Sequence, residues 1–192
     1  MPKKSIGWLE SLTRRNVRAL QPYSSARHEF SGEANIYLDA NENAFGSAGG
    51  GVHSRYPDPL QQELKRAISA QRQISVEHIF VGNGSDEAID LLIRAFCEPR
   101  QDSLIILPPT YGMYAVSAAI HDVGVLKVQL TPSFRLDLDG IMKASTARTK
   151  LLFICSPNNP TGTCFDHEEL TKLIQEFPGI VVLDEAYIDF CE

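Results

Sequence analysis

The polar side chain that suggests chemistry most directly is Asp184, because it follows a short apolar run. Residues 180–183 read Ile-Val-Val-Leu, which predicts a strand buried on both faces. A carboxylate at the end of such a strand lies where open α/β sheets bind ligands, and it needs a cation or several donors. A protonated ring nitrogen about 4 Å away would interact by ~4 kcal/mol at an effective dielectric near 20. The alternative is a carboxylate that caps the next helix.

Three other segments place polar groups at the ends of predicted strands. Residues 82–86, Gly-Asn-Gly-Ser-Asp, form a glycine turn before a helix, and its free backbone N–H groups would suit a phosphate. An ordinary tight turn with Ser85 as helix cap is the alternative. Tyr111 follows two prolines and would either stack on a flat ligand or be a partly buried tyrosine. Residues 156–162, Ser-Pro-Asn-Asn-Pro-Thr-Gly, predict a rigid turn that presents amides in fixed positions, although a simple turn remains the alternative.

Strand-like and helix-like segments alternate along most of the chain. Strands are predicted over 36–38, 79–81, 104–107, 123–130, 151–155 and 180–183. Helices are predicted over 60–72, 85–97, 111–119, 138–147 and 166–177, the last capped by Asp166. This alternation predicts an α/β fold, a three-layer sandwich with a mostly parallel sheet. We expect an N-terminal arm over residues 1–35 and one domain over residues 36–192.

The composition is that of a globular protein. Of the 192 residues, 43% are hydrophobic and 22% charged, and the net charge of −6 argues against a nucleic-acid partner. The sequence shows no run of membrane-spanning length and no secretory signal, so we expect no membrane partner and a cytoplasmic location. The cysteines have no CxxC spacing and are predicted to be reduced, buried thiols; they are Cys97, Cys155, Cys164 and Cys191.

Seven stretches together resemble the histidinol-phosphate aminotransferase family, which has the aspartate-aminotransferase fold (fold type I) of pyridoxal-phosphate enzymes. They are NVRALQPYSSAR (16–27), LDANENAFG (38–46), RYPDPLQQELK (55–65), GNGSDEAIDLLIRAFCEP (82–99), PPTYGMY (108–114), SPNNPTG (156–162) and DEAYIDF (184–190). They cover nearly the whole chain in the family's order. Ala44 stands where the family usually has proline, and the glycine-rich loop after it is short.

The resemblance implies a site for the ring of pyridoxal 5′-phosphate. Asp184 would keep the pyridine nitrogen protonated, which makes the ring an electron sink. Asn159 and Tyr187 would hydrogen-bond the phenolate oxygen of the ring, and Tyr111 would stack on the ring. The Asn159–Pro160 peptide bond is expected to be cis.

The resemblance also implies a site for the cofactor phosphate, a homodimer, and residues on the side of the cofactor where the substrate binds. It implies no metal ion. Gly84, Ser85 and Asp86 would bind the phosphate, chiefly through backbone N–H groups. Tyr56 would reach the phosphate site of the neighbouring subunit, so the active sites would be shared in a homodimer. Tyr23 and the Asn41–Asn43 segment, Asn43 in particular, would cover the substrate side.

The implied reaction is amino transfer between histidinol phosphate and 2-oxoglutarate, both small molecules, in histidine biosynthesis. The family needs a Schiff-base lysine in a Ser-x-x-Lys segment. None of the lysines lies in such a segment; they are Lys3, Lys4, Lys65, Lys127, Lys143, Lys150 and Lys172. We therefore expect the chain to be the N-terminal portion of such an enzyme, with an incomplete large domain, and to be inactive alone. Two alternatives stay open: a related lyase of the threonine-phosphate decarboxylase type, and a non-catalytic scaffold with the same fold.

Overall fold

The computed structural model describes residues 5–23, 36–51 and 53–191. The chain forms two compact units, one from residues up to Leu20 together with those from Gly82 onward, and one from Gln21–Val81. The predicted division into an arm over 1–35 and a domain over 36–192 stays a prediction. In the described ranges, no helix combines the length and apolar character needed to cross a bilayer.

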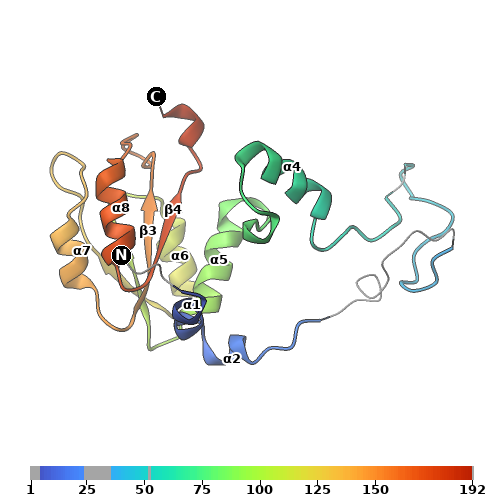
Figure 1. The fold of residues 1–192 in the computed structure, drawn as a ribbon, viewed down its shortest axis with the longest axis horizontal. Coiled ribbons are helices and arrows are strands. Elements are labelled where there is room, and N and C mark those ends of the chain that lie inside the picture. Colours follow the sequence, from blue (N-terminus) through green and yellow to red (C-terminus); the bar gives the residue numbers. More distant parts are fainter. Residues whose placement is uncertain (1–4, 24–35, 52, 192) are drawn as a thin grey trace. The chain divides into compact units, whose positions relative to one another are not determined.

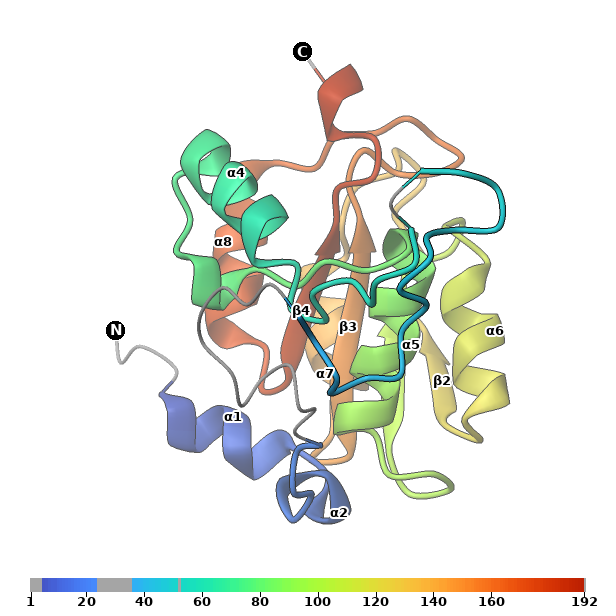
Figure 2. The same ribbon diagram turned by 90° about the vertical axis from the view of Figure 1, so that its right-hand side faces the viewer.

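A four-stranded parallel sheet forms the centre of the larger unit (Figure 1). Its strands are β1 (Ser103–Ile106), β2 (Gly124–Lys127), β3 (Thr149–Cys155) and β4 (Ile180–Asp184), in the spatial order β2-β1-β3-β4. Figure 2 shows β3 and β4 running side by side, with Cys155 opposite Asp184 in the register. β4 is half-buried along its length, so the prediction of a strand buried on both faces is wrong. The reason is that β4 has a strand neighbour on only one side within the described residues.

Helices cover both faces of the sheet, which confirms the predicted three layers. Helices α5 (Gly84–Phe96) and α6 (Met113–Ile120) lie on one face, while α7 (Leu138–Ala144) and α8 (His167–Glu176) lie on the other (Figure 1). α6, α7 and α8 each connect two successive strands of the sheet, as expected for parallel strands joined by helical crossovers.

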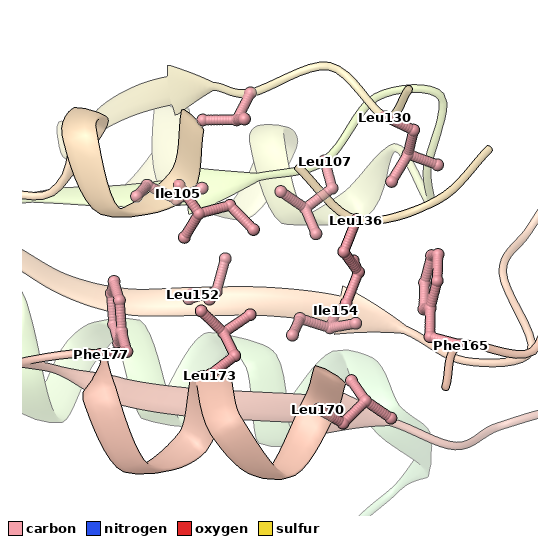
Figure 3. Close-up of a cluster of buried hydrophobic side chains, with 12 residues drawn as sticks. Ile105, Leu107, Leu130, Leu136, Leu152, Ile154, Phe165, Leu170, Leu173 and Phe177 are labelled. Carbon is pink, nitrogen blue, oxygen red and sulfur yellow. The ribbon is translucent and has the colours of Figure 1, made fainter. Parts of the chain in front are cut away.

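The alternation of side chains along β3 divides the hydrophobic core into two clusters. Leu152 and Ile154 belong to the cluster on the α7 and α8 side, and Figure 3 shows Leu173 and Phe177 reaching toward Leu152. Leu151, Phe153 and Cys155 belong to the opposite cluster, which includes Ile93 from α5 and Tyr114 from α6. The strand β3 is therefore buried on both faces, and the loop at its carboxyl end follows a strand that is packed on both sides.

The sequence predicts that Asp166 and Ser85 each cap the start of a helix, and the structure bears out one of these two caps. Asp166 caps α8 as predicted, because its Oδ1 accepts hydrogen bonds from the N–H groups of Glu168 and Glu169 at 2.9 and 3.1 Å. Ser85 does not cap α5: the helix begins at Gly84, after Asn83. Gly84 has a φ of +75°, which glycine adopts without strain, so the turn ends one residue earlier than predicted.

Two short strands that the sequence predicts are absent. Residues 36–38 and 79–81 are irregular, and both lie in the smaller unit. The described residues of that unit include the helix α4 (Gln62–Arg72) and the 3₁₀ turn η1 (Val76–His78). A run of three apolar residues becomes a strand only when a partner strand pairs with it, and these runs have none among the residues that the structure describes.

The N-terminal residues of the larger unit form α1 (Ile6–Leu12) and α2 (Arg15–Arg18). Between them, the Arg14 backbone N–H donates to the Ala95 carbonyl at 3.0 Å, and its guanidinium pairs with Glu98 at 3.2 Å. These contacts dock the N-terminal segment on the end of α5.

The cysteines divide into two kinds. Cys97 and Cys155 are buried free thiols as predicted, and burial raises the pKa of Cys97 to about 12. Cys164 and Cys191 form a disulfide, so the prediction that all four are reduced and buried is wrong for this pair. They are 27 residues apart and form no motif, but Cys164 lies past the end of β3 and Cys191 past the end of β4.

Candidate active site

A cavity of about 120 Å³ lies at the carboxyl ends of β3 and β4, beside the first turn of α5. We call it the edge cavity. Its lining residues are Ser85, Tyr111, Cys155, Asn159, Asp184, Ala186 and Tyr187. The structure therefore brings together five residues that the sequence analysis assigns to one cofactor site. Among the lining residues there is no lysine.

Asp184 is held by two hydrogen-bond donors. The Tyr114 hydroxyl donates to Oδ2 at 2.6 Å, and the Ala186 backbone N–H donates to Oδ1 at 3.1 Å. The strand itself is fixed at this point, because the Ser156 N–H donates to the Asp184 carbonyl at 2.9 Å. The expectation of several donors is thus met from within the protein, and the Ala186 contact is a local turn rather than a helix cap.

Tyr114 is the residue that sequence reasoning missed. Its side chain is completely buried, and its ring stacks on Phe153 with centroids 4.8 Å apart. Burial, followed by the hydrogen bond to Asp184, raises the pKa of Tyr114, so the phenol remains a neutral donor. One sequence feature could have indicated Tyr114: it lies three residues after Tyr111, in the first turn of a predicted helix that follows a predicted strand. Cys155, the last residue of β3, was also missed as a lining residue.

Tyr111 lies just before α6 and joins the edge cavity to the start of α5. Its hydroxyl donates to Asp86 Oδ1 at 3.1 Å, and its ring meets that of Tyr114 edge to face, 5.6 Å between centroids. The hydrogen bond to Asp86 is the main cause that raises the pKa of Tyr111, and burial and Asp184 add to it. The tyrosine is therefore oriented by two neighbours, with its ring on the cavity wall.

The segment 156–162 is tied to the segment before Tyr111. The side-chain amide of Asn158 donates to the Pro109 carbonyl and to Thr161 Oγ1, each at 2.9 Å. Asn158 is buried, whereas its neighbour Asn159 lines the edge cavity. The Asn159–Pro160 bond is cis as predicted, and the Ser156–Pro157 and Pro108–Pro109 bonds are cis as well.

The start of α5 provides backbone geometry that suits a phosphate. Gly84 has a φ of +75°, and a Cβ at this position would meet no atom within 4 Å, so the space around it is open. α5 is 13 residues long, and its N-terminal N–H groups favour an anion. The Asp86 carboxylate is held by Tyr111, which limits how far it can turn toward a ligand bound at these N–H groups.

Three predicted residues lie in the smaller unit, and their assignment stays a prediction. Tyr56 and Tyr23 are exposed, 68% and 88% respectively, and the Tyr56 N–H donates to Glu42 Oε1 at 2.7 Å. The Asn43 side chain spans a turn and donates to the Gly46 carbonyl at 2.6 Å.

Comparison with protein families identifies the group to which this arrangement belongs. The model of "Aminotransferase class I and II" matches residues 33–192. The chain belongs to this aminotransferase family. The match includes the elements that line the edge cavity, from α5 to the segment after β4.

Two curated relatives of this aminotransferase chain carry the same name. Histidinol-phosphate aminotransferase from Cytophaga hutchinsonii is 56% identical over 184 residues, which are 96% of this chain and 53% of the relative. The protein of the same name from Bacteroides thetaiotaomicron is 51% identical over 185 residues, 96% of this chain and 52% of the relative. The chain thus spans about half the length of the curated relatives it matches.

Solved aminotransferase structures share the fold of the larger part of the chain. N-succinyldiaminopimelate aminotransferase from Mycobacterium tuberculosis is 31% identical with a TM-score of 0.63, covering 69% of this chain and 38% of its own. A double mutant of Thermus thermophilus aspartate aminotransferase is 30% identical with a TM-score of 0.64, with the same coverage. The predicted fold class, a partial α/β domain of the aminotransferase type, is confirmed.

Proposed function

We propose that this chain provides the cofactor-binding portion of a histidinol-phosphate aminotransferase. The reaction would transfer an amino group between histidinol phosphate and 2-oxoglutarate. The observation that carries the proposal is Asp184: a carboxylate oriented by two donors at the end of a parallel strand, in a cavity whose other walls are an aromatic ring, an amide and a helix start. The names of the curated relatives supply the substrate.

The residues present fit pyridoxal 5′-phosphate, on which aminotransferases of this family depend. When bound, this cofactor supplies an electron sink for bond breaking at the substrate Cα. Asp184 would hold a proton on the ring nitrogen, because a carboxylate in a partly dry site favours a cation beside it. Tyr111 offers a ring face for stacking, while Asn159 and Tyr187 offer donors for an oxygen on the ring.

The first turn of α5 would hold the phosphate. Gly84, Ser85 and Asp86 place successive backbone N–H groups at the N-terminal end of the helix, where its dipole favours negative charge. Gly84 has no side chain, and a Cβ at its position would meet no atom within 4 Å, so its backbone is open on that side. The Asn83 N–H just before it already donates to Glu87 Oε2. A phosphate held there would anchor the cofactor beside the edge cavity, which Ser85 and Asp184 both line.

The proposal includes a homodimer and a second segment of chain. In the dimer, Tyr56 from a second copy would reach the phosphate, and Tyr23 and Asn43 would cover the substrate side. The relatives are about twice as long as this chain, and the edge cavity has no lysine in its lining. We therefore expect the amine that moves the proton to come from a segment beyond the 192 residues, and the chain alone to be inactive.

A fusion of this chain to the second half of the Cytophaga hutchinsonii relative tests the proposed function. The fusion should convert histidinol phosphate and 2-oxoglutarate and should not decarboxylate threonine phosphate. Asp184→Asn in the fusion should abolish turnover, whereas Asp189→Asn, which changes an exposed carboxylate five residues later, should leave it unchanged. Decarboxylation of threonine phosphate would support the lyase instead. A folded fusion that binds the cofactor but acts on neither substrate would support the scaffold.

A further inference from the structure

The contact between Tyr114 and Asp184 joins a helix to the strand end that carries the site. Tyr114 is the second residue of α6, and Asp184 is the last residue of β4. The 2.6 Å separation of Tyr114 Oη and Asp184 Oδ2 is typical of a hydrogen bond to an ionised acceptor. The two residues are 70 positions apart, so only the folded unit brings them together.

Tyr114 has little freedom to move. Its side chain has no exposed area, its ring lies nearly parallel to Phe153 at an angle of 15°, and Tyr111 packs edge-on against it. The hydroxyl is therefore a fixed point supplied by the core beneath the edge cavity. Asp184, in contrast, is half-buried and borders the cavity.

The two donors to Asp184 act on different oxygens. Tyr114 engages Oδ2 and the Ala186 N–H engages Oδ1, so the plane of the carboxylate is set at both ends. Each carboxylate oxygen accepts more than one hydrogen bond, so both retain capacity for a ligand. Of the two donors, only Tyr114 comes from a side chain, and only it can be removed without altering the backbone turn.

We propose that Tyr114 is a positioning residue, whose hydroxyl holds the Asp184 carboxylate in the orientation that meets the ring nitrogen of a bound pyridine cofactor. This rests on the proposed function, since it needs Asp184 to contact that ring. Tyr114 itself contacts no cofactor atom in this account and acts only through Asp184. A buried tyrosine that merely needed an acceptor would affect folding and not ring recognition.

Binding to the 192-residue chain separates the two roles. The probe is 4-deoxypyridoxine 5′-phosphate, which has the ring and the phosphate but no aldehyde to react with a lysine, and inorganic phosphate is the second probe. By calorimetry, Tyr114→Phe should weaken the ring probe about tenfold, the value of one hydrogen bond to a charged group. Its affinity for inorganic phosphate should not change. Ser117→Ala, a buried change one turn later on α6, should leave both affinities unchanged.

A double-mutant cycle tests whether Tyr114 acts through Asp184. Tyr114→Phe combined with Asp184→Asn should bind the ring probe no more weakly than Asp184→Asn alone. If Asp184→Asn weakens the probe but Tyr114→Phe does not, the positioning role is wrong and the proposed function stands. Equal losses for the ring probe and for phosphate in Tyr114→Phe would show a structural role only and would overturn the inference. If the unmodified chain does not bind the probe, or Asp184→Asn binds it unchanged, the proposed cofactor site fails and the inference fails with it.

A second variant covers the case in which Tyr114→Phe does not fold. Asp184→Glu keeps the negative charge but adds one methylene, which changes the position of the carboxylate relative to the Tyr114 hydroxyl. If position matters, Asp184→Glu should lose as much affinity for the ring probe as Asp184→Asn. Affinity like that of the unmodified chain would contradict the positioning role.

Discussion

Gly179→Ala is the substitution whose effect on stability follows most directly from the structure. Gly179 lies just before β4, where a Cβ would come within 2.4 Å of the Lys150 carbonyl oxygen and 2.8 Å of Phe177 Cε1. The carbonyl belongs to β3, which is paired on both sides and cannot move aside without breaking the sheet. Overpacking of this kind costs ~1–3 kcal/mol, and a backbone obstacle places Gly179→Ala at the upper end, about 3 kcal/mol.

The assay is urea unfolding of the 192-residue chain, followed by far-ultraviolet circular dichroism, with Gly112→Ala as the matched control. A Cβ at Gly112 meets no atom within 4 Å, and its φ of −70° and ψ of −24° suit alanine. This control should therefore be neutral or more stable by ~0.4–1 kcal/mol. If Gly179→Ala unfolds within ~0.5 kcal/mol of the unmodified chain, the close approach of β3 and the start of β4 is wrong. Equal losses in both variants would contradict the reasoning as well.

Three further predictions concern a crosslink, a charge pair and a helix cap. Reduction of the Cys164–Cys191 disulfide, which joins residues 27 positions apart, should lower the free energy of unfolding by about 3–4 kcal/mol. The Cys164→Ser variant should be as stable as the reduced chain, and its stability should not change with reductant. Equal stability of the unmodified chain with and without reductant would contradict the crosslink. The hydrogen bond from His121 lowers the pKa of Asp90 in the folded chain below its ordinary value of 3.8. The ionised Asp90 therefore stabilises the fold at pH values above 3.8, and this stabilisation is lost as the pH falls through the pKa of Asp90 in the folded chain. In Asp90→Asn, the free energy of unfolding should fall less steeply with decreasing pH below about pH 4 than in the unmodified chain. The same pH dependence in both chains would refute this. Asp166→Ala should lower the free energy of unfolding by ~1 kcal/mol, and Asp166→Ser should lower it by less. A thermal unfolding measurement in which Asp166→Ser is no more stable than Asp166→Ala would contradict the cap.

The elements of the larger unit were predictable because their patterns are local. The apolar spacing in α5 and the run in β3 each identify an element from a few neighbouring residues, and the order of elements then requires a parallel sheet. Residues 36–38 and 79–81 show the limit of such reasoning. An apolar run alone does not establish that a partner strand exists.

The site was predictable where a residue directly follows a strand and unpredictable where two distant segments meet. Asp184 is found by its place at the end of β4, and Asn159 by its place after β3. The bond from Tyr114 to Asp184 and the disulfide from Cys164 to Cys191 depend on tertiary packing between segments that share no sequence pattern. Tyr114 also looks like an ordinary core aromatic, and only the structure shows where its hydroxyl lies.

The most direct test of the account is the protonation state of the ring nitrogen at Asp184. It can be read from the nitrogen chemical shift of ¹⁵N-labelled 4-deoxypyridoxine 5′-phosphate bound to the chain, at a pH where the free compound is neutral at nitrogen. We expect a protonated nitrogen with the unmodified chain and a neutral nitrogen with Asp184→Asn. A neutral nitrogen with both would contradict the central claim that Asp184 holds the proton on the ring.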